Sequence, residues 1–174
     1  MKEHYVTLFD STFLPQGMAL YKSMLEIGED FHLWILCFDK KQISILKKLK
    51  IENITYIEIK NFENDTLLRL KNERTISEYC WTLTPFSMEW VFKLDQRTKR
   101  LTYIDADLFF LKSPKDIFEE FEESNKDVLI TKHSFAPQND LSFEAGKYCV
   151  QFITIKRGKG EEILRKWKEQ CINW

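Results

Sequence analysis

Two aspartates, Asp105 and Asp107, interrupt an apolar stretch that reads LTYIDADLFFL over residues 101–111. Side chains of an extended strand alternate between its two faces, so both carboxylates are expected on one side, close enough to share a hard cation. Mg²⁺ and Mn²⁺ prefer oxygen ligands, and such ions are commonly held by one or two carboxylates together with substrate phosphates. The pair therefore predicts a Mg²⁺ or Mn²⁺ site in a protein that handles a phosphate-bearing substrate. The alternative is a surface turn in which the aspartates only cap backbone groups.

Four further residues have both a chemical and a structural interpretation. Asp10 would either contact a ligand or cap the helix that follows it. Phe13 would either stack on a base or make the apolar contact, known as a hydrophobic staple, at the start of that helix. Arg74 suits bidentate contact with a phosphate but would also be stable as a solvated side chain. Gln151 is an amide within an apolar run, so it must find buried partners or face a cleft.

Strands and helices alternate along the first part of the chain, and this pattern must position the polar residues. Apolar runs predict strands over residues 5–9, 31–37 and 54–59, and apolar residues at helical spacing predict helices over 14–25 and 43–49. Strands that are apolar on both faces are typical of a mostly parallel sheet covered by helices. Ligands of such sheets bind beyond the carboxyl ends of the strands, where the loop after residue 9 and the aspartate pair are expected.

The middle of the chain predicts two consecutive helices. The first covers residues 76–83, with Tyr79 and Trp81 as core or pocket-wall residues. Thr84 can cap a second helix with Pro85 at its first position, where the missing N–H costs nothing, so this helix is predicted over 86–94. The remaining patterns predict helices over 113–121 and 163–171 and strands over 128–131 and 148–155.

Composition indicates one ordinary globular domain, because 44% of the 174 residues are hydrophobic and 30% are charged. The net charge of -1, with both signs interleaved, argues against a nucleic-acid partner. The chain has no apolar run long enough to span a bilayer and opens without a signal peptide, so a cytoplasmic protein is expected. The cysteines are too widely spaced to suggest a zinc cluster or a disulfide framework; they are Cys37, Cys80, Cys149 and Cys171.

Four segments, in this order, resemble bacterial nucleotide-diphospho-sugar transferases related to glycosyltransferase family eight. They are residues 7–11 (TLFDS), 78–85 (EYCWTLTP), 103–108 (YIDADL) and 146–152 (GKYCVQF), and the resemblance covers essentially the whole chain. The resemblance implies a GT-A fold, a Rossmann-like sheet that binds a nucleoside diphosphate sugar, with the Asp-x-Asp motif holding the metal on the diphosphate. It also favours a uridine diphosphate sugar as the donor.

The resemblance implies roles for individual residues as well. Arg74 would reach the donor's phosphates or sugar, and Gln151 would face the donor sugar or the acceptor as a catalytic residue. Asp105 and Asp107 would hold Mn²⁺ or Mg²⁺. The loop after the first strand would contact the base and ribose through Leu8, Phe9, Asp10, Thr12 and Phe13.

The chain departs from the family pattern near its end. Related transferases are longer, and they place a third metal ligand, often a histidine, and an Asp-Gln pair in a C-terminal portion without a counterpart here. The apolar pattern of the last helix still runs at Ile172 and Trp174, with no terminating Gly or Pro. We therefore expect residues 1–174 to be one domain that lacks its C-terminal portion. Apolar surface around Trp167, Ile172 and Trp174 would then favour self-association.

The sequence thus predicts a metal-dependent glycosyltransferase that moves a sugar from a nucleoside diphosphate sugar to an unknown acceptor. One alternative is a protein that binds the nucleotide sugar without transferring it, because the C-terminal portion is lacking. Another is a metal-dependent phosphohydrolase. In that class the Asp-x-Asp pattern is expected on the first strand, where this chain offers only Asp10.

Overall fold

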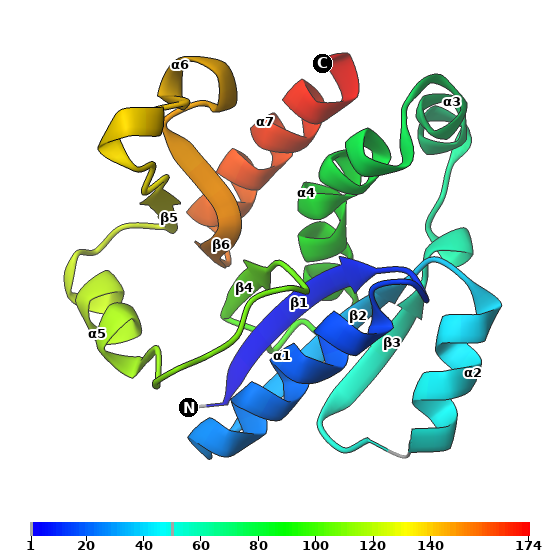
Figure 1. Ribbon diagram of the computed structural model, residues 1–174, viewed down its shortest axis with the longest axis horizontal. Helices are drawn as coiled ribbons and strands as arrows, with labels where there is room; N and C mark the ends of the chain where they lie inside the picture. Colours follow the sequence, from blue (N-terminus) through cyan, green and yellow to red (C-terminus); the bar gives the residue numbers. More distant parts are fainter. Residues whose placement is uncertain (1, 50) are drawn as a thin grey trace.

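A computed structural model describes residues 2–49 and 51–174, which form a six-stranded sheet flanked by helices (Figure 1). The strand order is β3-β2-β1-β4-β6-β5; β3, β2, β1 and β4 run parallel to one another, whereas β6 is antiparallel to both β4 and β5. The prediction of a mostly parallel α/β sheet is therefore confirmed. The strands are β1 (Glu3–Phe9), β2 (Phe31–Cys37), β3 (Ile54–Glu58), β4 (Arg100–Ile104), β5 (Val128–Lys132) and β6 (Tyr148–Lys156).

Seven α-helices connect and cover these strands in the described residues. All the predicted helical segments are helical, and α3 and α6 are additional helices. The start of α3 has a local signal, because the side chain of Asn64 accepts a hydrogen bond from the Leu67 amide at 3.0 Å. The helices are α1 (Leu14–Ile27), α2 (Lys40–Leu49), α3 (Asp65–Glu73), α4 (Ile76–Leu94), α5 (Lys115–Glu123), α6 (Ser142–Ala145) and α7 (Lys159–Asn173).

The helices bury both faces of the sheet. On one face α3, α4 and α7 pack against alternate residues of the strands, such as Val6 and Leu8 of β1. On the other face α1, α2 and α5 pack against the intervening residues, including Tyr5 and Phe9. Gly17 of α1 lies so close to the Phe9 ring that a Cβ atom would have no room there. This glycine lets α1 approach the carboxyl end of β1.

The prediction of two helices separated at Thr84 and Pro85 is wrong, because α4 is continuous from Ile76 to Leu94. Pro85 lacks the N–H that would bond to the carbonyl of Trp81, which normally disfavours a helix interior. Side chains beyond the proline are buried against the sheet, among them Phe86 (5% exposed) and Trp90 (4% exposed). We infer that this packing outweighs the lost hydrogen bond and keeps the helix intact.

None of the helices in residues 2–49 and 51–174 combines the length and apolar character needed to cross a membrane.

Candidate functional site

Three adjacent parallel strands end beside one another, and an aspartate follows each of them. Asp10 follows β1, Asp39 follows β2 after one residue, and Asp105 follows β4. Together with Asp107 they line a cavity of about 550 Å³ at this edge of the sheet. This is the edge at which parallel α/β sheets bind their ligands.

The wall opposite the strand ends comes from α3, α4 and the loop that joins them. Tyr79 is buried at 3% exposed, and Trp81 is 59% exposed, so the interpretation of these residues as pocket wall is confirmed. Lys71 also lines the cavity and forms a 2.7 Å ion pair with Glu63, which accepts a hydrogen bond from the Tyr79 hydroxyl at 2.8 Å. Lys71 was missed in the sequence because nothing local distinguishes it from other helical lysines.

Asp105 and Asp107 lie in a turn, so the prediction of an extended strand through them is wrong. β4 ends at Ile104, and the amide of Leu108 donates to the carbonyl of Asp105 at 3.2 Å. The backbone amide of Asp105 donates to the Gln151 carbonyl of β6 at 3.0 Å. Both aspartates nevertheless line the same cavity.

The two carboxylates differ in their surroundings. Asp105 is half-buried, and its Oδ1 accepts a 2.8 Å hydrogen bond from the hydroxyl of Tyr103, whereas Asp107 is exposed. Burial raises the pKa of Asp105 above its usual value; the Tyr103 hydrogen bond opposes this shift, and the charge of Asp107 adds to it. Burial also raises the pKa of Tyr103 well above that of a free tyrosine, so its hydroxyl keeps its proton at neutral pH.

Asp10 and Asp39 organise the loops around the cavity. Oδ1 of Asp10 accepts from the amides of Thr12 at 2.8 Å and Phe13 at 3.1 Å, so it closes a turn in the loop before α1. It does not cap the helix, because the N-cap residue of α1 is Phe13, without a side-chain cap bond. Asp39 joins two segments, because it accepts from the Ser11 amide at 2.9 Å and from the Gln42 amide at 2.7 Å.

Burial tends to raise the pKa of Asp39. Backbone hydrogen bonds from Gln42 and Ser11 outweigh that effect and leave the pKa below its usual value. This residue was missed, although its place one residue after an apolar strand was a usable signal.

Most of the residues predicted for the site meet in this cavity, and two do not. Thr12 is exposed and is not part of the cavity wall. Gln151 is also exposed, so the strand does not force its amide to find a buried partner; its backbone carbonyl instead holds the amide of Asp105. The predicted residues that line the cavity are Leu8, Phe9, Asp10, Phe13, Arg74, Asp105 and Asp107.

The guanidinium of Arg74 is bound to the end of α7. It donates to the carbonyl of Cys171 at 2.7 Å, to the carbonyl of Trp174 at 2.7 Å and to the hydroxyl of Thr82. It also lies over the Trp174 ring, 5.3 Å from its centroid. The guanidinium of Arg74 is therefore not freely solvated, because protein groups already occupy its donors. Its hydrogen bonds connect the end of α7 to the wall of the cavity.

Surface exposure of the last helix differs from the prediction. Trp167 and Ile172 are partly buried and pack against the core beneath α4, while Trp174 is 67% exposed and lies 6.2 Å from the Trp81 ring, centroid to centroid. The apolar surface expected around these three residues is thus smaller than predicted.

The site suits a metal ion that a substrate helps to hold. Across residues 2–49 and 51–174, no group of three or more His, Cys, Asp or Glu side chains is arranged to hold a metal ion alone. Asp105 and Asp107 both supply carboxylate oxygens to the cavity wall. Hard cations such as Mg²⁺ accept one or two carboxylates when substrate phosphates complete the ligand shell, so the donor set fits Mg²⁺ or Mn²⁺ in that setting.

Comparison with known proteins finds no matching family model. The chain is 34% identical over 178 residues to the uncharacterized protein YfnF of Bacillus subtilis (strain 168); the match covers 99% of this chain and 59% of YfnF. The chain therefore spans somewhat more than half the length of this curated relative.

Two solved structures show the same architecture at low sequence identity. Mouse xyloside xylosyltransferase 1, in its apo form, matches with a TM-score of 0.64 and 11% identity, over 98% of this chain and 74% of that one. The galactosyltransferase LgtC, in complex with donor and acceptor sugar analogs, matches with a TM-score of 0.58 and 13% identity, over 98% of this chain and 65% of that one. The GT-A fold implied by the resemblance is thereby confirmed: the chain has the fold of these glycosyltransferases.

Proposed function

We propose that this chain is the nucleotide-sugar-binding domain of a metal-dependent glycosyltransferase. The observation that carries the proposal is the cavity at the carboxyl edge, where Asp10, Asp39 and Asp105 follow three adjacent strands. None of these carboxylates, nor Asp107, forms an ion pair with another described residue. Negative charge without a protein counter-ion, in a cavity large enough for a nucleotide, suits a cation and a diphosphate.

Each part of the cavity has a role in this proposal. Asp105 and Asp107 would hold Mg²⁺ or Mn²⁺ against the diphosphate of the donor. When bound, the ion would act as a Lewis acid that stabilises negative charge on the departing diphosphate. Phe13 (48% exposed) and Trp81 (59% exposed) present apolar surface that a bound nucleoside would cover.

The base and ribose are assigned to the β1 side of the cavity. Leu8, Phe9, Asp10 and Phe13 line it there, and the exposed Thr12 supports the loop through the hydrogen bond that its backbone amide donates to Asp10. Uridine is favoured by the resemblance. Calorimetry should show uridine diphosphate binding more tightly than adenosine diphosphate, with Asp10→Ala reducing the difference. Equal affinities for the two nucleotides would remove the support for base recognition by this loop.

Gln151 is proposed to face the donor sugar or the acceptor. Its support is position, because its backbone carbonyl accepts a hydrogen bond from the amide of Asp105 and the residue is exposed. The acceptor is unassigned, since the chain spans 59% of YfnF and the remainder of such a protein would contribute to the complete reaction.

A phosphohydrolase is the less favoured alternative. Its Asp-x-Asp pattern would be expected at the end of β1, where this chain has Asp10 followed by Ser11 and Thr12. The pair instead follows β4, in a turn, and faces the same cavity as the β1 loop. That arrangement favours a nucleotide ligand over direct attack on a phosphate ester.

One experiment separates these functions. The protein is incubated with radiolabelled nucleoside diphosphate sugars, with and without Mn²⁺, beside the variants Asp105→Asn and Asp116→Asn. Asp116 is an exposed carboxylate in the first turn of α5 and serves as the matched control. Mn²⁺-dependent donor binding, with transfer or slow donor hydrolysis, that is lost only in Asp105→Asn supports the proposal. Metal-dependent cleavage of generic phosphate esters without nucleotide preference would contradict it, and binding without transfer or hydrolysis would identify a binding protein.

A further inference from the structure

Tyr103 places a single polar atom against the carboxylate pair. The residue is 3% exposed, its ring belongs to the core beneath α4, and its hydroxyl donates to Oδ1 of Asp105 at 2.8 Å. We propose that Tyr103 is a positioning residue, whose hydroxyl orients the Asp105 carboxylate for a divalent cation; this inference rests on the proposed function.

Asp105 is fixed by both its backbone and its side chain. Its amide donates to the Gln151 carbonyl at 3.0 Å, its carbonyl accepts from the Leu108 amide at 3.2 Å, and its side chain is bonded to Tyr103. Asp107 is exposed and has no side-chain hydrogen bond to another described residue. One carboxylate is therefore oriented before any ligand arrives, while the other remains free to adjust to the substrate.

The hydroxyl also suits the charge of its partner. Asp105 is half-buried and has no ion pair within the described residues, so its charged form depends on hydrogen-bond donors. A hydroxyl that donates to one carboxylate oxygen leaves the second oxygen available to a cation. A lysine or arginine at this place would neutralise the carboxylate and compete with the metal. Tyrosine thus holds the ligand in place while leaving its negative charge uncancelled.

The test uses Tyr103→Phe, which removes one oxygen atom and retains the buried ring. Tyr21→Phe is the matched control, because Tyr21 is also buried (8% exposed) and donates to a protein acceptor, the Glu52 carbonyl at 3.0 Å, outside the cavity. Electron paramagnetic resonance measures the Mn²⁺ affinity of each variant in the presence of uridine diphosphate. Calorimetry measures uridine diphosphate affinity without metal.

We expect Tyr103→Phe to weaken Mn²⁺ binding roughly 10-fold, the effect typical of removing a group that orients a metal ligand. Metal-free uridine diphosphate affinity should stay the same, and Tyr21→Phe should leave both affinities unchanged. In the Asp105→Asn background, Tyr103→Phe should cause no further loss of Mn²⁺ affinity, because the hydroxyl acts through that carboxylate.

The outcomes distinguish this inference from the proposed function. Equal Mn²⁺ affinity in the parent protein and Tyr103→Phe would overturn the positioning role while leaving the metal-dependent function intact. The same loss of Mn²⁺ affinity in Tyr21→Phe would also overturn it, since the effect would then follow general destabilisation. Absence of Mn²⁺ binding by the parent protein, with or without uridine diphosphate, would overturn the proposed function and the inference together. Melting temperatures measured without metal verify that each variant is folded.

Discussion

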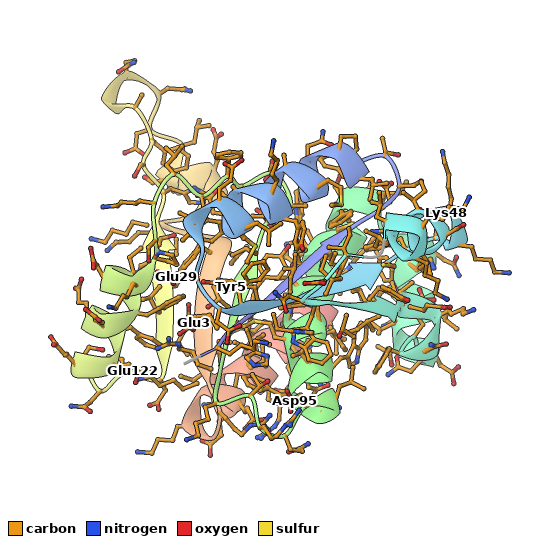
Figure 2. The ribbon with its side chains drawn as sticks, turned by 90° about the horizontal axis from the view of Figure 1, so that it is seen from below. Glu3, Tyr5, Glu29, Lys48, Asp95 and Glu122 are labelled. Carbon is orange, nitrogen blue, oxygen red and sulfur yellow. The ribbon has the colours of Figure 1, made fainter. Side chains whose placement is uncertain are left out.

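Three carboxylates at the amino edge of the sheet and three at the carboxyl edge have different kinds of partner. At the amino edge, where Figure 2 shows Glu3, Asp95 and Glu122, each of these three is paired with a cation: Glu3 and Glu122 with Arg100, and Asp95 with Arg97. At the carboxyl edge, Asp10, Asp39 and Asp105 accept hydrogen bonds from backbone amides or a hydroxyl, and none of them forms an ion pair with another described residue.

The difference separates structural carboxylates from those available to a ligand. Arg100 is 8% exposed, contacts two carboxylates and lies 4.3 Å from the centroid of the Phe118 ring, so it joins β4 to β1 and α5. A burial of this kind is stable only while the charges are paired. The carboxylates of the cavity have no such partner among the described residues, although a stable fold alone would favour pairing them. Four predictions test this contrast, in order of decreasing expected effect.

Arg100→Met should lower the free energy of unfolding by about 3 kcal/mol, because it leaves the carboxylate of Glu3 poorly compensated in a buried setting. Urea unfolding measures this effect. Lys115→Met is the control; its partner Glu119 is exposed and 3.6 Å away, so the change should be within about 1 kcal/mol. Uridine diphosphate affinity should stay the same in both variants, and a large loss of affinity in folded Arg100→Met would show that the two edges are not independent.

Asp105→Asn should weaken Mn²⁺-dependent uridine diphosphate binding roughly 100-fold, equivalent to about 2.7 kcal/mol. It should also raise the melting temperature of the ligand-free protein. The sign follows from the raised pKa: an aspartate whose folded pKa is raised by burial loses stability as pH rises through that pKa, so the charged group is unfavourable at pH 7. Calorimetry and thermal unfolding at pH 7 measure the two effects. A lower melting temperature with unchanged Mn²⁺-dependent uridine diphosphate affinity would contradict this prediction. Asp105 would then be a structural residue and not a metal ligand.

Arg74→Met should lower the free energy of unfolding by about 2 kcal/mol, because the bonds from its guanidinium to the carbonyls of Cys171 and Trp174 are lost. Its effect on uridine diphosphate affinity should be smaller than that of Asp105→Asn, since the guanidinium is already bound to α7. Denaturant unfolding and calorimetry measure both quantities. Unchanged stability with a 100-fold loss of nucleotide affinity would instead favour the phosphate contact implied by the family resemblance.

Two histidines at the amino edge should give the smallest effect, visible as pH dependence. Burial lowers the pKa of His4 and of His32, whose ring centroids lie 5.9 Å apart with the rings tilted by 37°. Folded histidines with lowered pKa bind fewer protons than unfolded ones, so their contribution is complete above the unfolded pKa near 6.5 and is lost as pH falls through the lower folded pKa.

Unfolding free energies measured between pH 7 and pH 5 should therefore decline, and the decline should be shallower in His4→Gln/His32→Gln. Nucleotide affinity at pH 7 should not change in this double variant, because both residues lie at the edge away from the cavity. An identical pH dependence in the parent and the double variant would show that other groups control stability in this range.

The amino-acid sequence by itself determined the class of fold and most of its elements, although not α3, α6 or the continuity of α4. The apolar runs of β1 and β2 and the helical spacing of α1 are local patterns. Burial on both faces of these strands can therefore be predicted without knowing which elements lie beside them. The same reasoning placed Asp10 and the Asp105 and Asp107 pair at the carboxyl edge, because that position follows from the class of sheet.

Only the tertiary structure decided which groups meet. Arg74 is bound to carbonyls at the end of α7, about a hundred residues away along the chain, and no local pattern encodes such a partner. Packing against the sheet carries α4 through Pro85, although local propensity favours a break there. The turn at Asp105 depends on the Gln151 carbonyl of an antiparallel strand, whose place beside β4 is a property of strand order. Periodicity reports which faces of an element are buried, whereas strand order and distant contacts determine what covers them.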